Sequence, residues 1–341
     1  MLYRSQELRT PSATVRTPTL FPVRNIGKRS SDNTPLYHES ISDLNTAMVN
    51  SFAIHQHEDL QTEVADQGIH ELIGFDGVVF ADSGGFDLTE SDSPPESEKI
   101  LEIQERMEAD IWATLDLPLL PDMSGKCKEE RKQKNIEFAL EASESKEAPG
   151  LLYASVHGHD PRTIQNSINY LGKHGEFDGF ALGGLVPLRT DYSKVIDLVL
   201  AARTATDKPL HVFGLGGLLY QPLLMYLGVD TFDSTAFIRC GSHRRYFVPG
   251  FGDHNISDFD RLEQPPCPCP VCSQHTLSEV RESRNLVTKH NLWALVTEVR
   301  RFKWMIEIGE DLENYLDLRY EGNDVTKRAF NIAKQRVRRL S

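Results

Sequence analysis

Three cysteines crowd into the segment CPCPVC, at Cys267, Cys269 and Cys272. The spacing C-x-C-x-x-C suits a metal better than a disulfide framework, and thiolates favour tetrahedral zinc. The fourth ligand is either His275, which would make a cramped loop, or His290, which begins a predicted helix and could clamp the segment onto the rest of the chain. Three thiolates and one imidazole would close the coordination shell, so we expect a structural rather than a catalytic Zn²⁺.

Three aspartates each follow a short apolar run. Asp82 lies in ADSGGFD, Asp116 in ATLDLPLLPD and Asp233 in FDSTAF. Each could instead cap a helix or begin a turn. Brought together, one carboxylate could act as a nucleophile and another as a general acid/base. Glycosyl transfer uses such a pair, because a carboxylate stabilises an oxocarbenium-like centre. A third could accept hydrogen bonds from the N–H groups of a base.

The elements that would position these aspartates are short runs rich in β-forming residues. There are eight of them, at 19–23, 47–54, 77–82, 111–116, 151–157, 179–184, 210–216 and 229–234. Apolar residues at helical spacing fill several gaps, at 97–108, 128–144, 161–172, 191–205 and 218–227. This alternation predicts an α/β fold, a (β/α)8 TIM barrel, with a doubly wound open sheet as the alternative.

In a barrel of this kind, chemistry lies at the C-terminal ends of the strands. The residues predicted there are Asn50, Asp82, Asp116, His157, Gly183, Gly184, Gly214 and Asp233. We therefore expect one catalytic barrel domain over residues 1–341. A zinc-binding insertion after the last strand would form a subdomain at about 265–310, and a basic C-terminal helix would lie at about 324–340.

The composition narrows the class of protein. The chain has 341 residues, of which 39% are hydrophobic and 26% charged, as is ordinary for a globular protein. A net charge of −13 argues against a uniformly basic surface and leaves room for a local basic groove. No apolar run is long enough for a membrane span. The opening MLYRSQELRT lacks the apolar core of a signal peptide, so we expect a cytoplasmic location.

The chain resembles the tRNA-guanine transglycosylases, because eight segments occur in the order found in that family. They are RTPTLFPV (16–23), ADSGGF (81–86), ATLDLPLLPD (113–122), FALGGL (180–185), HVFGLG (211–216), FDSTAF (232–237), CPCPVC (267–272) and HNL (290–292). Each segment alone is a weak signal, whereas the ordered set is specific. The resemblance implies a zinc-bearing barrel that exchanges guanine in a nucleic acid for a 7-deazaguanine base, as in queuosine or archaeosine formation.

The resemblance also implies roles for individual residues. Asp233 would be the nucleophile at C1′ of the ribose, Asp82 the general acid/base, and Asp116 the reader of the purine N–H edge. Further substrate contacts would come from Ser83, Phe86, His157, Gly183 and Gly184. Cys267, Cys269, Cys272 and His290 would bind Zn²⁺, and the zinc region would form a homodimer interface.

The sequence departs from the family pattern at two positions. Asp87 stands where family members usually have Gln, and His157 replaces a purine-reading Gln. These changes keep the catalytic aspartates but leave two substrates open: tRNA, or DNA as in a divergent branch that inserts 7-deazaguanines into DNA. A non-catalytic partner subunit is a further alternative, against which the retention of both Asp82 and Asp233 speaks.

A nucleic-acid partner requires positive charge. Arg244 and Arg245 follow the proposed nucleophile in HRRY, so we expect them to contact phosphate. Their charge would also favour the ionised form of Asp233. The segments 298–304 and 327–339 add basic residues, with solvated helix faces as the alternative, which is equally weighted for 327–339.

Overall fold

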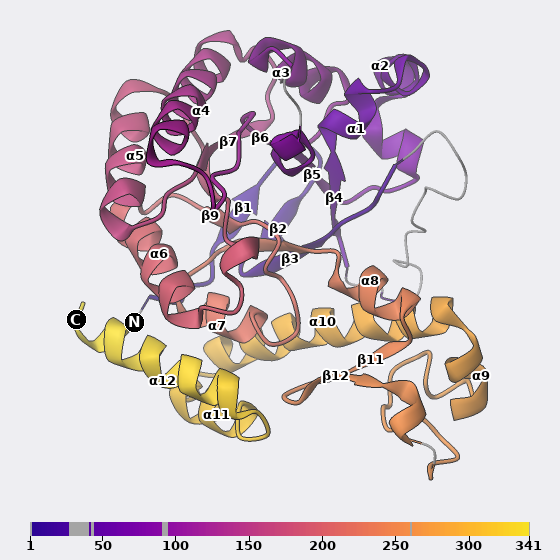
Figure 1. Cartoon of the computed structure of the whole chain (residues 1–341). Helices are drawn as coiled ribbons and strands as arrows, with labels where there is room; N and C mark the ends of the chain where they lie inside the picture. Colours follow the sequence, from indigo (N-terminus) through magenta and orange to yellow (C-terminus); the bar gives the residue numbers. More distant parts are fainter. Residues whose placement is uncertain (1, 27–40, 42–43, 91–94, 260, 341) are drawn as a thin grey trace.

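Eight parallel strands form the centre of the molecule (Figure 1). The computed structural model describes residues 2–26, 41, 44–90, 95–259 and 261–340. Neighbouring strands follow the order β3-β10-β9-β8-β7-β6-β5-β4. Their bounds are β3 (Thr19–Pro22), β4 (Thr46–Asn50), β5 (Val78–Asp82), β6 (Ile111–Ala113), β7 (Leu151–Val156), β8 (Gly179–Leu182), β9 (Leu210–Val212) and β10 (Thr231–Ser234).

The sheet nearly closes into a barrel between its first and last strands. A parallel bridge joins Val23 to Met48, and the Arg24 N–H donates to the Met48 carbonyl at 2.8 Å. This contact between β3 and β4 is incompatible with an open, doubly wound sheet, whose edge strands lie far apart. The predicted eight-stranded α/β barrel is therefore confirmed.

Helices surround the barrel, and several of them begin at a residue whose side chain caps the first turn. The Asp160 carboxylate accepts from the Thr163 N–H and precedes Pro161, and the Asp191 carboxylate accepts from the Lys194 N–H. The surrounding helices are α1 (Ser51–His55), α2 (Glu58–Ile73), η2 (Gly85–Glu90), α3 (Ser97–Arg106), α4 (Gly125–Ser145), α5 (Pro161–His174), η3 (Val186–Leu188), α6 (Tyr192–Ala205), α7 (Gln221–Tyr226) and α8 (Ala236–Ser242). Their apolar faces and the outer face of the sheet share one core.

Three strands end at least three residues earlier than their apolar runs predict. The run 47–54 is strand only to Asn50, whose side chain accepts from the Ala53 N–H and begins α1. The runs 111–116 and 210–216 leave the sheet after Ala113 and Val212. An apolar run cannot show where a ladder of hydrogen bonds stops, because a cap or a loop packed on the barrel also buries apolar residues.

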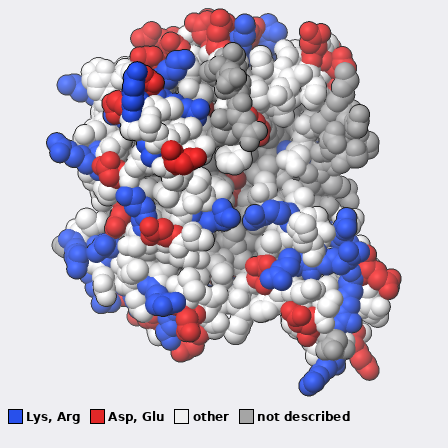
Figure 2. Space-filling model, in the orientation of Figure 1, with Lys and Arg blue, Asp and Glu red and all other residues white. Residues whose placement is uncertain are grey.

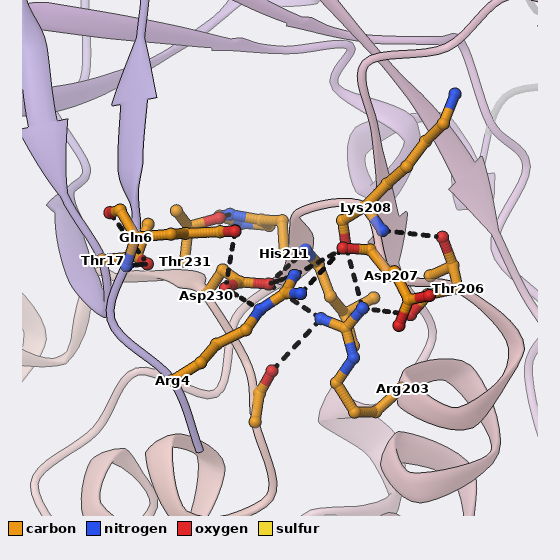
Figure 3. Close-up of polar contacts among 12 residues, drawn as sticks. Arg4, Gln6, Thr17, Arg203, Thr206, Asp207, Lys208, His211, Asp230 and Thr231 are labelled. Carbon is orange, nitrogen blue, oxygen red and sulfur yellow. Dashed lines mark hydrogen bonds and ion pairs between the residues drawn. The ribbon is translucent and has the colours of Figure 1, made fainter. Parts of the chain in front are cut away.

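A two-stranded hairpin, β1 (Glu7–Arg9) and β2 (Thr14–Arg16), covers the N-terminal end of the barrel. Leu8 and Val15 pack with the aromatic residues inside the barrel. Beside the hairpin, the buried carboxylate of Asp230 accepts from Arg4, Gln6 and Arg203 (Figure 3). Because this end is sealed, the C-terminal ends of the strands form the accessible mouth.

The chain after the barrel contains the hairpin β11 (Arg245–Val248) and β12 (Gly252–Asn255), then η4 (Ile256–Phe259), α9 (Leu277–Glu282), α10 (Arg284–Glu307), α11 (Leu312–Arg319) and α12 (Asp324–Arg338). Its first part, from β11 to the start of α10, forms a second, smaller apolar core that includes Tyr246, Val280 and Val287. The buried apolar residues of α11 and α12 belong to the main core. The long helix α10 contacts α8, α7 and β3, so it joins this part to the barrel (Figure 1). Among the described residues, no helix has the length and apolar character needed to cross a membrane.

Candidate active site and metal centre

The three predicted aspartates meet at the mouth of the barrel. Asp82 ends β5, Asp233 lies near the end of β10, and Asp116 follows β6 by three residues. Burial and the negative charges of Asp116 and Asp233 raise the pKa of Asp82 to about 8, although a hydrogen bond from the Gly84 backbone opposes the shift. Asp82 is therefore mostly protonated at neutral pH and can donate a proton.

Asp233 is held through one of its two oxygens. The Gly214 N–H donates to Oδ1 at 2.6 Å, and His211 Nε2 lies 3.4 Å from the same oxygen. Among the described residues, nothing hydrogen-bonds to Oδ2. His211 was not singled out from the sequence, although its place in the strand segment HVFG, two residues before the mouth, is a signal that could have found it.

Asp116 is bound by two neighbouring side chains. Ser83 Oγ donates to Oδ1 at 2.9 Å, and His157 Nε2 lies 2.6 Å from Oδ2. A Cβ on Gly85 would lie 2.4 Å from Asp116 Oδ1, so this turn requires glycine. The structure thus brings the predicted site residues Ser83, Asp116 and His157 together at the mouth.

The glycine pair 183–184 passes directly over His157. A Cβ on Gly183 would lie 2.5 Å from His157 Cε1, and Gly184 has a φ of 74°, which favours glycine. The Gly183 N–H donates to the Val156 carbonyl at 3.0 Å, so this donor is already used within the barrel. The Gly184 N–H has no partner among the described residues and is the donor left for a ligand.

Phe86 and Asp87 lie on the rim of the mouth, in η2. Phe86 is 63% exposed, so its ring is accessible to a flat ligand. The Asn50 amide donates to the Asp87 carboxylate at 2.7 Å. Asn50 is aligned with Asp82 on the neighbouring strand. The hydrogen-bonded Asn50 and Asp87 side chains therefore lie next to Asp82, whose pKa is raised.

The predicted metal ligands form one cluster after the barrel strands. One ligand atom from each of Cys267, Cys269, Cys272 and His290 lies within 4.8 Å of all the others. His290 Nδ1 is 3.5 Å from the Sγ atoms of Cys269 and Cys272. His275 instead lies 3.9 Å from Glu279 and is not in the cluster. The structure thereby decides between the two histidines in favour of His290.

The surroundings of this cluster orient its imidazole. His290 Nε2 lies 2.9 Å from the Phe247 carbonyl, so Nε2 carries the proton and Nδ1 presents its lone pair to the thiols. The Tyr246 ring stacks on His290 at 3.7 Å between centroids, and its hydroxyl lies 3.1 Å from Cys272 Sγ. A donor set of three sulfurs and one oriented nitrogen fits a tetrahedral metal ion.

The predicted phosphate contacts, Arg244 and Arg245, both have partners within the protein. Arg244 Nε donates to the Arg281 carbonyl at 2.8 Å, and Arg245 Nε to the Asp253 carboxylate at 2.6 Å. Neither guanidinium is bonded to Asp233, whose described donors are the N–H groups of Gly214 and His211. Their side chains therefore brace the segment after the barrel.

The basic residues of α12 are also engaged in the protein. Lys327, Lys334, Arg336 and Arg338 form ion pairs with Glu321, Asp317, Asp197 and Glu313 respectively. In contrast, Arg239 on α8 and Arg284 at the start of α10 are exposed and have no ion-pair partner among the described residues. Figure 2 shows basic side chains gathered over α8, β11 and α9, beside the mouth.

The fold and the site define a class: an α/β barrel with carboxylates at its mouth and a Cys₃His cluster after its strands. A family model described as queuine tRNA-ribosyltransferase matches residues 1–322. The chain belongs to this family.

Relatives named tRNA-guanine(15) transglycosylase are similar to this chain. One from Methanosarcina mazei is 33% identical over 321 residues, covering 91% of this chain and 64% of the relative. One from Pyrococcus abyssi is 32% identical over 306 residues, covering 87% and 51%. One from Haloferax volcanii is 31% identical over 314 residues, covering 88% and 59%. The chain thus spans between about half and just under two thirds of the length of these relatives.

Proposed function

We propose that this chain exchanges guanine in a nucleic acid, tRNA in the first place, for a 7-deazaguanine base through a covalent Asp233–ribosyl intermediate. The observation that carries the proposal is the carboxylate cluster at the mouth. It combines an acid that is protonated at neutral pH, Asp82, with a carboxylate that is fixed through only one oxygen, Asp233. Membership of the family and the names of the relatives support the same chemistry.

Asp233 is the proposed nucleophile. Its Oδ2 forms a bond to C1′ of the ribose as the bond from C1′ to the guanine nitrogen breaks. The electron pair of the broken bond leaves with the base, and Asp82 supplies the proton that makes guanine a neutral leaving group. In the second half of the reaction, the incoming base gives a proton to Asp82 and attacks C1′, which releases the Asp233 carboxylate.

The base pocket follows from the residues around Asp116. The Asp116 carboxylate would accept hydrogen bonds from the edge of the base. Ser83 and His157, which are bonded to the same carboxylate, would hold it in place. The Gly184 N–H would donate to the base, and the exposed ring of Phe86 would cover its face. Bare backbone at residues 183–184 suits this purpose, because a flat ring can approach it closely.

Cys267, Cys269, Cys272 and His290 would hold a Zn²⁺ ion in a closed tetrahedral site. The ion would supply structural cross-linking between the CPCPVC segment and α10, and no catalytic step involves it. We propose that this zinc-binding part, together with α12, belongs to the same functional domain as the barrel.

The test measures incorporation of labelled guanine into polymers. The protein is incubated with labelled guanine and either tRNA or duplex DNA, and the polymer is then precipitated and counted. We expect label in tRNA. Label in DNA alone would assign the chain to DNA modification instead, and label in neither would contradict the proposed exchange.

Asp233→Asn keeps the shape of the side chain but removes the nucleophile. We expect this variant to bind the polymer and to exchange at least about 1,000-fold more slowly, because residual binding cannot replace the covalent step. A denaturing gel of enzyme, nucleic acid and a 9-deazaguanine inhibitor would show the covalent adduct as a shifted band. A band of full strength in Asp233→Asn would place the nucleophile elsewhere.

A further inference from the structure

His211 is a fully buried histidine in the strand next to Asp233. It lies in β9 with no exposed surface, and β10 aligns it with Thr231. Its ring packs against Phe80 and Phe213, each with 4.6 Å between ring centroids. A polar ring in such an apolar layer loses hydration, so its two nitrogens need partners within the protein.

Both ring nitrogens have such partners. Nδ1 lies 2.9 Å from Thr231 Oγ1, and Nε2 lies 3.4 Å from Asp233 Oδ1. Figure 3 shows Thr231 and His211 beside the Asp230 network at the N-terminal end of the barrel. The imidazole therefore connects the sealed end of the barrel with the mouth.

These contacts define which nitrogen carries the proton. An ionised carboxylate only accepts hydrogen bonds, so Nε2–H must donate to Asp233. Burial lowers the pKa of His211, and the hydrogen bond with Asp233 opposes this shift. The ring is then neutral, and Nδ1 accepts from the Thr231 hydroxyl. The carboxylate of Asp233 thus selects the tautomer, and the Thr231 hydroxyl, which can donate or accept, satisfies Nδ1.

We propose that His211 is a positioning residue: it turns the Asp233 carboxylate so that Oδ1 stays bonded within the barrel and Oδ2 is the attacking oxygen. The Gly214 N–H holds Oδ1 from a second direction. Two donors on one oxygen restrict rotation of the carboxylate, which would otherwise present either oxygen at varying angles. The inference rests on the proposed function, because it concerns the same nucleophile.

The kinetic test uses three substitutions in the exchange assay. His211→Phe keeps an aromatic ring but removes both nitrogens, so kcat should fall on the order of 10- to 100-fold while KM for the nucleic acid changes less than about 2-fold. His211→Gln offers an amide donor near the position of Nε2 and should recover part of the loss. Thr231→Val removes only the hydroxyl bonded to Nδ1, so it should lower kcat less than His211→Phe does.

Tyr153→Phe is the matched control. Tyr153 is another buried aromatic residue inside the barrel, and its hydroxyl has no partner among the described residues. Removing that hydroxyl should leave kcat and KM unchanged. If His211→Phe is folded and retains kcat within about 2-fold, or if it raises KM alone, the positioning role is wrong.

A second readout does not depend on activity. Nitrogen-15 NMR of the imidazole should show the Nε2–H tautomer of His211, with a shift of the Nε2 resonance in Asp233→Asn. An Nδ1–H tautomer would overturn the inference, because His211 could not then donate to Asp233. If the unsubstituted protein labels no polymer, the proposed function fails, and the tautomer alone decides whether His211 holds Asp233.

Discussion

At the scale of single residues, the three aspartates at the mouth of the barrel differ in burial and in hydrogen-bond partners. Asp82 is half-buried, and the loss of solvent and the nearby carboxylates of Asp116 and Asp233 disfavour its charged form. Asp233 accepts two N–H groups on one oxygen, and Asp116 accepts a hydroxyl and an imidazole. The same residue type can therefore act as acid, nucleophile and base reader.

The raised pKa of Asp82, about 8, predicts the pH dependence of the reaction. The protonated form is the active acid, so kcat/KM should fall as the pH rises through about 8, and Asp82→Asn should lose exchange at every pH. A profile of kcat/KM between about pH 6 and 10 measures this. An unchanged rate above pH 9 would contradict the acid role.

Asp82 should also affect stability in a defined direction. Its pKa is raised from 3.8 to about 8. Between about pH 4 and pH 8, the folded protein therefore keeps a proton that the unfolded chain has already released. The free energy of unfolding should therefore decrease as the pH rises through this window. Asp82→Asn removes this dependence, so its melting temperature should exceed that of the unsubstituted protein at pH 8. Equal melting temperatures there would argue against the raised pKa.

His157 is the residue expected to set base selection. Its Nε2 is committed to Asp116, and its buried Nδ1 has no partner among the described residues. Since Nε2–H donates to the Asp116 carboxylate, Nδ1 offers an acceptor, whereas Gln offers both a donor and an acceptor. His157→Gln should change the ratio of kcat/KM for guanine and for a 7-deazaguanine by about 10-fold, which competition assays measure. An unchanged ratio would show that other groups select the base.

At the scale of elements, the Cys₃His cluster explains how a segment with little regular structure becomes ordered. CPCPVC contains two prolines and three cysteines, and the small core around Tyr246 and Val287 is its main apolar support. A metal ion would join this segment to α10, which in turn packs on the barrel. Loss of one ligand should therefore affect folding of the whole segment.

Cys269→Ala tests this link between metal and stability. We expect the purified protein to contain about one zinc per chain by elemental analysis, and Cys269→Ala to lose both the zinc and several degrees of melting temperature. Cys127→Ala is the control, because Cys127 lies in α4, outside the cluster. A Cys269→Ala protein with full zinc content and an unchanged melting temperature would refute the assignment.

At the scale of the whole molecule, an acidic chain carries a basic region beside its mouth. The net charge is −13, yet basic side chains gather over α8, β11 and α9 (Figure 2). Many other basic residues are paired within the protein, as in α12. The basic region beside the mouth is therefore suited to bind a phosphate backbone.

Arg239 is the exposed arginine nearest in sequence to Asp233 that lacks an ion-pair partner among the described residues. Arg239→Ala should weaken nucleic-acid binding and reduce the slope of log K against log salt by about 1, because one phosphate contact is lost. Arg9→Ala is the control, since Arg9 lies at the opposite end of the barrel, in β1. Equal salt slopes for the two variants would exclude Arg239 from the interface.

The sequence alone determined the repeating pattern of the fold and the candidate chemistry. Eight β-rich runs predicted an α/β fold and favoured the barrel, because local apolar patterning reflects burial, whereas the contact between β3 and β4 excluded the doubly wound sheet. The three aspartates could be singled out because each follows a predicted strand, and the C-x-C-x-x-C motif because its spacing suits a metal ion. Strand ends were predicted less well, since capping by Asn50 and the turn at Gly214 are invisible to apolar patterning.

Only the tertiary structure decided which groups meet. His211 in β9 contacts Asp233 in the adjacent strand β10, and His290 rather than His275 completes the cysteine cluster. Arg244 and Arg245 turned out to be bound by backbone and by Asp253, although they follow the nucleophile closely in sequence. Adjacency along a chain specifies neither direction nor distance across a barrel, because register and helix packing fix where each side chain points.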